Sequence, residues 1–295
     1  MKKGPADRIW ERTVVATPYL WLLVFFLAPF FIIFKISFAD PLIALPPYTP
    51  FWDSAKGFLA TLDNYRFLTE DDLYWISYLN SIKVAAISTL ICVLIGYPMA
   101  YGIARAQGAW RNILLLLVIL PFWTSFLLRV YAWMGMLSTQ GVVNKTLMAL
   151  GLVSEPLQIL YTDAAVYLGI VYTYLPFMIL PLYASLERLD GSLLEAATDL
   201  GARPHRVFLD VTLPLSVPGL IAGSMLVFIP AIGEFVIPAL LGGVDTLMIG
   251  KTLYDEFFNN RDWPLASAVA TILVLILVLP IMLFQHYQQL DEEQP

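Results

Sequence analysis

Long apolar stretches separated by short polar connections dominate this chain of 295 residues. Six of the stretches reach the roughly 20 apolar residues that a helix needs to cross a bilayer. The pattern therefore predicts an all-α membrane protein with six transmembrane helices. We expect these helices at 14–38, 79–104, 113–137, 164–186, 213–241 and 265–284.

The composition agrees with a location in the lipid bilayer. Hydrophobic residues make up 59% of the chain and charged residues 14%, against about 25% charged residues in a typical soluble domain. Cys92 is the only cysteine, so an intramolecular disulfide is impossible, and the chain has too few Cys and His residues for a metal cluster. The net charge of −6 argues against nucleic acid as a partner.

The distribution of Lys and Arg predicts the orientation, because these residues concentrate in the cytoplasmic connections of membrane proteins. With the N-terminus inside, nine of them fall on the cytoplasmic side and seven on the outer side. The short loop between Arg105 and Arg111 is the clearest indicator, since short loops follow the rule best. We therefore expect both termini in the cytoplasm.

This orientation divides the chain into segments. The apolar run after the basic residues 1–13 is too long for a cleaved signal, so we expect it to remain as the first transmembrane helix. The expected order is a cytoplasmic segment 1–13, the first helix 14–38, an extracytoplasmic segment 39–78, a core 79–287 and an acidic cytoplasmic tail 288–295. A short amphipathic helix is expected at 61–68 within the extracytoplasmic segment.

Proline interrupts nearly every predicted membrane helix, where it removes a backbone donor and tends to kink the helix. In a membrane, such breaks persist only where the freed carbonyls are buried in protein or face a watery cavity. A transport path therefore explains the pattern better than a simple anchor. Gly219 and Gly223 form a small-xxx-small step that predicts close approach of another helix to the fifth membrane helix.

Two charged residues lie well inside the predicted membrane helices, away from their ends, where an unpaired charge costs a few kcal/mol or more. They are Glu234 and Arg129. One hypothesis is that Glu234 and nearby aromatic faces attract an amine cation by ion pairing and cation–π contact. The alternative is a structural Glu234–Arg129 pair, or a position of Glu234 near the outer interface. The aromatic candidates for the first hypothesis are Trp133, Tyr172 and Tyr174.

The main polar element on the cytoplasmic side is the loop 187–212. Ser192 and Glu195 have the spacing of a capping box at a helix start. Ala196 and Ala197 are small enough for close approach by a neighbouring surface. Gly201 fits the position after a helix end, where a left-handed backbone is favourable only without a Cβ. The loop thus predicts a short helix followed by a tight turn.

A second short helix follows in the same loop. Pro204 suits its first turn, and Pro214 is expected to begin the fifth membrane helix. An ordinary helical hairpin with a solvated charge cluster at its tip is the simpler interpretation of these residues. The second helix carries Val207 and Phe208, and the charged tip comprises Arg203, His205 and Arg206.

The spacing of Glu195-Ala196-Ala197, Gly201, Val211 and Leu213-Pro214 resembles the loop by which bacterial ABC importer permeases dock onto their ATPase subunits. Over most of its length the chain resembles the membrane subunits of ABC importers with the methionine-permease fold. The resemblance implies a five-helix permease core, here at 79–287, plus one N-terminal helix. It also implies a subunit without catalytic residues, placed in the bacterial inner membrane.

The resemblance further implies a set of partners. A cytoplasmic ATPase dimer would bind the ATP and receive the loop, while this chain would hold no cofactor. A second, homologous permease would complete a heterodimer, and a periplasmic solute-binding protein would deliver the substrate to the outer face.

Several segments look like those of putrescine/spermidine permeases, a subfamily of these importers. At Ala239 the chain departs from the subfamily, where a carboxylate is expected. An ABC permease for another solute, such as an amino acid, an anion or an iron chelate, remains an alternative. A secondary transporter is a further alternative, although it would not need the docking loop. The matching segments begin at Asn80, Gly96, Pro121, Leu128 and Ile232.

Overall fold

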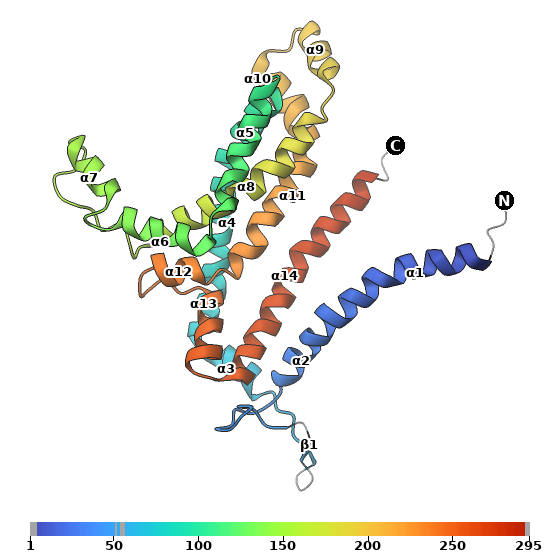
Figure 1. Ribbon diagram of the computed structural model, residues 1–295, viewed down its shortest axis with the longest axis vertical. Helices are drawn as coiled ribbons and strands as arrows, with labels where there is room; N and C mark the ends of the chain where they lie inside the picture. Colours follow the sequence, from blue (N-terminus) through green and yellow to red (C-terminus); the bar gives the residue numbers. More distant parts are fainter. Residues whose placement is uncertain (1–4, 51, 54–56, 293–295) are drawn as a thin grey trace. The chain divides into compact units, whose positions relative to one another are not determined.

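The computed structural model describes residues 5–50, 52, 53 and 57–292, so the expected segments 1–13 and 288–295 lie partly outside the described residues. Within these ranges it is helical apart from one two-stranded sheet (Figure 1). The chain divides into two compact units. The first holds the residues up to Asp72 together with Leu253–Leu275, and the second holds Leu73–Thr252 and the residues from Ile276 onward.

The first unit begins with a long apolar helix. It consists of α1 (Pro5–Leu22), a π-helical turn η1 (Leu23–Leu27) and α2 (Ala28–Ile36). Its apolar part, Thr13–Ile36, is long enough to span a membrane, and its most apolar residues are not buried against other parts of the described chain. These side chains are therefore available to lipid. Pro29 lies just after η1, and because it lacks an N–H the ladder widens there.

The segment 39–72 of this unit contains a short hairpin and a short helix. Strands β1 (Trp52–Asp53) and β2 (Gly57–Phe58) pair antiparallel. Helix α3 (Asp63–Glu70) confirms the helix expected near 61–68. The buried Asn64 amide donates hydrogen bonds to the carbonyls of Ser37 and Ala39, which fixes α3 to the end of the first long helix. The unit is completed by a π-helical turn η4 (Asp255–Asn259) and the first residues of α14 (Trp263–Glu292).

The second unit is built around three long helices. They are α4 (Asp72–Arg105), α8 (Asp163–Glu187) and α11 (Leu213–Ile232). A core of buried side chains joins them, including Cys92, Tyr97, Met178, Leu182 and Val227. The shorter elements are α5 (Ala109–Ile119), the 3-10 turn η2 (Leu120–Trp123), α6 (Phe126–Leu137), α7 (Val142–Ala149), α9 (Gly191–Asp199), α10 (Pro204–Val207), the π turn η3 (Phe208–Thr212), α12 (Val236–Leu241) and α13 (Ile249–Tyr254).

The third apolar stretch, 113–137, is not one straight membrane helix. It bends by 91° between Ala109–Trp123 and Phe126–Ala149. Pro121 lacks the N–H that would continue the ladder, and the backbone of Thr124 is extended. Five described helices are long and apolar enough to span a membrane, or six if this bent pair forms one span.

The fifth stretch, 213–241, also differs from the expectation. Its helix ends at Ile232, and the remaining residues form a break followed by α12. At the other end it starts earlier, because Pro204–Ile232 forms one continuous apolar helix through η3. Pro214 lies at the start of α11, as expected, but η3 joins α11 to α10 without a break. Pro214 follows the π turn, as Pro29 does in the first unit.

The close approach expected at Gly219 and Gly223 is confirmed, since α8 and α11 lie side by side (Figure 1). A Cβ added at Gly219 would lie 2.5 Å from the Cβ of Ser185 and 2.8 Å from the carbonyl oxygen of Pro181. A Cβ at Gly223 would lie 2.9 Å from the sulfur of Met178. The two glycines therefore set the distance between α8 and α11.

Replacing Gly219 by alanine should destabilise the protein by about 1–3 kcal/mol, because the added methyl overpacks the helix contact. The thermal unfolding midpoint of the purified protein in detergent micelles measures this loss. Gly102→Ala is the matched control, because a Cβ there meets nothing within 4 Å. It should leave the midpoint unchanged or raise it, since alanine is the better helix former. Equal midpoints for both variants would contradict the packing role of Gly219.

Candidate functional site

The loop 187–212 begins with a helix start that differs from the predicted capping box. Asp190 is the N-cap of α9, and its carboxylate accepts a hydrogen bond of 3.0 Å from the Ser192 N–H. Ser192 lies inside the first turn, so the Ser192–Glu195 capping box is wrong. Hydrogen bonds from Ser192 lower the pKa of Asp190 below its ordinary value. The carboxylate therefore stays charged at the positive end of the helix dipole at neutral pH.

Helix α9 ends just before Gly201, as the sequence predicted. Gly201 has φ +85°, a left-handed conformation that favours glycine. The Gly201 N–H bonds to the Thr198 carbonyl at 2.8 Å, and the Ala202 N–H bonds to the Ala197 carbonyl at 3.1 Å. These two bonds form a Schellman motif, which satisfies carbonyls at the helix end. Helix α9 is thus closed at both ends, and its position is fixed by backbone geometry.

The second helix of the loop starts at Pro204, as expected, and continues through η3 into α11. Because there is no break, a movement of α10 is carried directly into the apolar helix. Arg206 and Asp210 lie 3.8 Å apart on the exposed surface of this helix, a geometry that contributes little to stability. Arg203, His205 and Arg206 are exposed, in agreement with a solvated tip.

An aromatic contact anchors the loop to α4. The ring of Phe208 meets the edges of Tyr97 and Tyr101, with ring centroids 5.5 and 6.2 Å apart. The Arg105 guanidinium lies over Tyr101 at 5.3 Å. A pocket of about 390 Å³ lies between the loop and α4. It is lined by Tyr101, Arg105, Leu194, Thr198, Ala202, Pro204, Val207, Phe208 and Thr212.

The face of the loop away from this anchor is accessible. Leu200 is 90% exposed and Leu193 is 48% exposed, next to the exposed Glu195 and Ala196. Solvent-exposed apolar side chains on a rigid element favour contact with another protein. The predicted loop residues divide into an exposed group (Ser192, Glu195, Ala196, Gly201, Arg203, His205, Arg206 and Pro214) and a half-buried group (Ala197, Val207 and Phe208).

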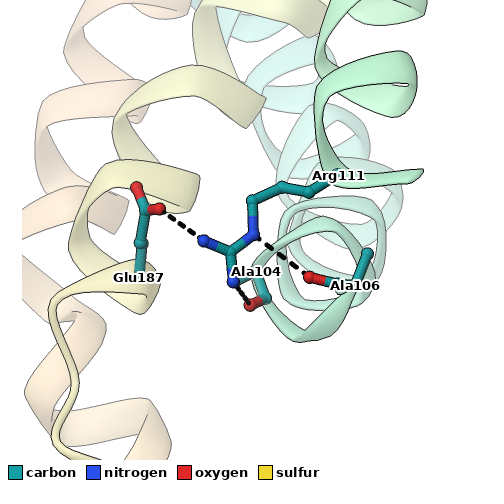
Figure 2. A network of polar contacts seen from close by, with 4 residues as sticks. All are labelled: Ala104, Ala106, Arg111 and Glu187. Atoms are coloured by element: carbon teal, nitrogen blue, oxygen red, sulfur yellow. Dashed lines mark hydrogen bonds and ion pairs between the residues drawn. The ribbon is translucent and has the colours of Figure 1, made fainter. Parts of the chain in front are cut away.

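Arg111 forms a polar network near the start of this loop (Figure 2). Its Nη1 lies 2.8 Å from Oε1 of Glu187, at the end of α8. Its Nε donates to the Ala106 carbonyl at 3.1 Å, and its Nη2 lies 3.5 Å from the Ala104 carbonyl. One guanidinium therefore joins α8 to the end of α4. The sequence suggested only a basic loop here, because the pairing with Glu187 spans 76 positions.

A second candidate site surrounds Glu234 in the break after α11. Its Oε1 accepts from the N–H groups of Phe235, Val236 and Ile237 at 3.1, 3.0 and 3.3 Å. Its Oε2 accepts from the Tyr174 hydroxyl at 2.6 Å. Glu234 thus satisfies the donors at the start of α12, a role that the sequence did not indicate. Its side chain is buried and only 7% exposed.

The Glu234–Arg129 ion pair, one of the alternatives raised by the sequence, is absent from the described part of the chain. Both residues line the same pocket of about 420 Å³. The Arg129 guanidinium lies over the Phe122 ring at 5.8 Å, and its buried Nε and Nη1 have no hydrogen-bond partner among the described residues. Oε1 of Glu234 accepts from the donors of α12 and Oε2 accepts from the Tyr174 hydroxyl, so the carboxylate is held by these groups rather than by Arg129.

The pocket collects some of the predicted path residues but not all. Tyr174 lies in it together with Phe122, Phe126 and Phe177. Trp133 and Tyr172 instead pair edge to face at 5.3 Å, and neither is among the residues that line the pocket. The walls are therefore largely aromatic, with one carboxylate and one guanidinium.

Broken helices, a largely aromatic pocket with one carboxylate and one guanidinium, and a rigid exposed loop are together typical of a membrane permease. Residues 92–290 match the family of binding-protein-dependent transport system inner membrane components. The chain belongs to this family, as a multi-pass inner-membrane permease subunit.

The chain is also similar to named relatives over nearly its whole length. It is 40% identical over 279 residues to the spermidine/putrescine transport system permease protein PotB of Haemophilus influenzae, covering 95% of this chain and 93% of that protein. PotB of Escherichia coli K12 is 39% identical over 277 residues, covering 94% and 97%. The molybdenum transport system permease protein ModB of Mycobacterium bovis is 34% identical over 204 residues, covering 68% and 74%.

Solved structures agree on the fold. A chain of a bacterial alginate ABC transporter, in complex with an alginate-bound periplasmic protein, superimposes with a TM-score of 0.73 at 17% identity, covering 97% of this chain and 96% of that one. A chain of the MetNI methionine ABC transporter gives a TM-score of 0.54 at 17% identity, covering 74% of this chain and 96% of that one. The fold is that of an ABC importer permease, and this chain is longer than the methionine permease.

The structure suggests a test of the helix start at Asp190. Asp190→Ala should speed hydrogen–deuterium exchange of the amides at 191–193 in the purified protein, because the first turn of α9 loses its acceptor. Ser192→Ala is the comparison variant and should speed exchange less than Asp190→Ala, because it removes only the hydroxyl bond to Asp190 and keeps the backbone N–H bond. Because folding lowers the pKa of Asp190, the cap is complete above the ordinary pKa and is lost as the pH falls through the lower folded value. Faster exchange in Ser192→Ala alone would restore the capping-box assignment.

Proposed function

We propose that this chain moves polyamines of the putrescine and spermidine type into the cytoplasm. The supporting observation is the identity of 40% and 39% with two spermidine/putrescine permeases over about 95% of the chain. The subfamily segments at Pro121 and Ile232 border the pocket that contains Glu234. Sequence similarity and pocket position therefore point to the same solute class.

The pocket offers chemistry that suits an amine. Oε2 of Glu234 accepts only the Tyr174 hydroxyl, so this carboxylate oxygen retains a lone pair for one ammonium group. The aromatic rings of Tyr174, Phe122 and Phe177 can face the alkyl chain and the cationic ends of a polyamine. We assign Glu234 two roles, as the cap of α12 and as the contact for an amine.

Arg129 favours a second candidate function. Its Nε and Nη1 have no hydrogen-bond partner among the described residues, and in the same pocket they could bind an anion, as an amine substrate could not. The relative named for molybdenum transport is 34% identical over a shorter part of the chain. An importer of an oxyanion is therefore the alternative to polyamine import.

Transport is driven through the loop 187–212. In this proposal a cytoplasmic ATPase dimer binds ATP and contacts the exposed face around Leu193, Glu195 and Leu200. A second, homologous permease forms a heterodimer with this chain, and a periplasmic binding protein delivers the solute. The family description and the alginate transporter with its periplasmic protein support the last of these partners. The loop and both termini then face the cytoplasm.

Uptake by the complete assembly in proteoliposomes tests this function. Labelled putrescine and spermidine should enter the vesicles only when the loaded binding protein is outside and ATP is inside. The inside is then the side that the loop 187–212 faces. Unlabelled polyamine should compete, whereas molybdate or an amino acid should not. Uptake that persists without ATPase or ATP would indicate a secondary transporter. If only molybdate competed, the proposed solute would be an oxyanion and not a polyamine. If ATP acted only from the outside, the proposed orientation of the loop would be wrong.

Glu234→Gln tests the amine contact. Glutamine keeps a carbonyl oxygen for the α12 donors but removes the charge, so the KM for putrescine should rise roughly ten- to hundredfold, as expected from hydrogen bonds to a charged group that contribute about 1.5–3 kcal/mol. Uptake kinetics and size-exclusion chromatography of the assembly measure KM and assembly. Glu70→Gln, at an exposed carboxylate of the first unit, is the control and should change neither. Unchanged amine uptake by normally assembled Glu234→Gln would limit Glu234 to the capping role.

A further inference from the structure

The polar network of Arg111 lies where the loop joins the membrane helices. Glu187, its partner, is the last residue of α8 and precedes the N-cap Asp190 by three positions. The two carbonyls that Arg111 contacts belong to the C-terminal end of α4 and the turn after it. Figure 2 shows the guanidinium between these two elements. Arg111 itself lies in the first turn of α5, so three helices meet at one side chain.

Helix α5 leads directly from this network to the pocket around Glu234. Val118 of α5 is buried in the core of the second unit, which holds the helix against its neighbours. The chain then enters η2, where Phe122 lines the pocket, packs against Phe177 at 5.2 Å and lies under Arg129. From Arg111 to Phe122 the path is about 16 Å at the helical rise per residue. A displacement at the start of α5 therefore reaches an aromatic wall of the pocket through one short, packed element.

The strength of the ion pair does not account for this arrangement. The side chains of Arg111 and Glu187 are 35% and 41% exposed, and exposed pairs contribute little to stability. The planar guanidinium nevertheless contacts acceptors from two segments at once, which a lysine cannot do with the same geometry. The network is thus suited to fixing relative position rather than to holding the fold together.

We propose that Arg111 is the positioning residue that transmits movement of the loop to α5, and through α5 to Phe122 in the pocket wall. Glu187 carries the movement from the loop side, and the carbonyls of Ala104 and Ala106 hold the guanidinium on the α4 side. This inference rests on the proposed coupling of the loop to a partner ATPase. It assigns a mechanical role to residues that touch neither ATP nor solute.

The complete assembly in proteoliposomes tests this role by measuring solute uptake and ATP hydrolysis together. Arg111→Gln should lower the uptake per ATP by about two- to thirtyfold, the range for mutations that alter coupling between sites, while hydrolysis continues. Glu187→Gln should have a smaller effect of the same kind, because the carbonyl contacts of Arg111 remain. Arg111→Lys should restore part of the loss. Arg66→Gln, which removes an exposed ion pair with Glu70 in the first unit, is the matched control and should change neither rate.

A second measurement reports on the pocket without requiring solute. Phe126 lines the pocket, and the thiol of a Phe126→Cys variant should react with a water-soluble maleimide at a rate that changes when a non-hydrolysable ATP analogue is added. The native Cys92 is buried and provides a low background. Arg111→Gln should abolish this nucleotide response, and Arg66→Gln should preserve it.

The two measurements separate the possible failures. An unchanged uptake per ATP together with a preserved maleimide response in Arg111→Gln would overturn the role of Arg111. A parallel fall of uptake and hydrolysis with normal assembly would also overturn it, because coupling would then be intact. If the wild-type assembly imports no polyamine but shows the nucleotide response, the proposed solute is wrong while the role of Arg111 is still decided by the maleimide rates.

Discussion

Hydrocarbon offers no hydrogen bonds, so every interruption of a membrane helix needs a partner for the backbone groups that it frees. In this chain those partners are also the residues that shape the functional surfaces. Glu234 closes the break after α11 by accepting three backbone N–H groups at the start of α12. The same break exposes one of its oxygens to Tyr174 and the pocket. The requirement to satisfy the backbone thus places a carboxylate inside the membrane region.

Outside the apolar part water can satisfy the backbone, and capping instead gives the loop a fixed shape. Asp190 closes one end of α9 and Gly201 closes the other. Phe208 attaches the second half of the loop to the aromatic rings of α4. A loop that is capped and anchored in this way can transmit a displacement to α8 and α11, because it moves as a rigid element and does not unfold.

The sequence predicted the features that depend on composition and local spacing. Apolar length located the membrane helices, and the small residues Gly219 and Gly223 identified the face of the α8 contact. Gly201 predicted the left-handed turn because only the local backbone decides that conformation. The helix start was missed because Ser192 and Asp190 both suit a cap, and the path of the chain out of α8 decides between them.

Features that depend on distant residues could not be predicted in this way. The 91° bend after α5 follows a proline, but most prolines in these helices cause no such bend. Tyr174, one partner of Glu234, lies 60 positions away in the sequence, and Glu187, one partner of Arg111, lies 76 positions away. One alternative paired Arg129 with Glu234, yet Oε1 of that carboxylate accepts from the donors of α12 instead. Residue spacing in the sequence does not show which of several donors will bind the Glu234 carboxylate.

The π turn η3 sets the rotational phase between the loop and the membrane helix that follows it. A π turn contains one residue more than an α-helical turn, and each residue advances a helix by about 100°. Deleting a single residue from 208–212 would therefore allow a regular α-helix, yet it would swing Phe208 away from Tyr97 and Tyr101. The number of residues between Gly201 and Pro214 therefore sets the angle at which the loop is rotated relative to α11. This number matters to the permease whichever side chains occupy the positions.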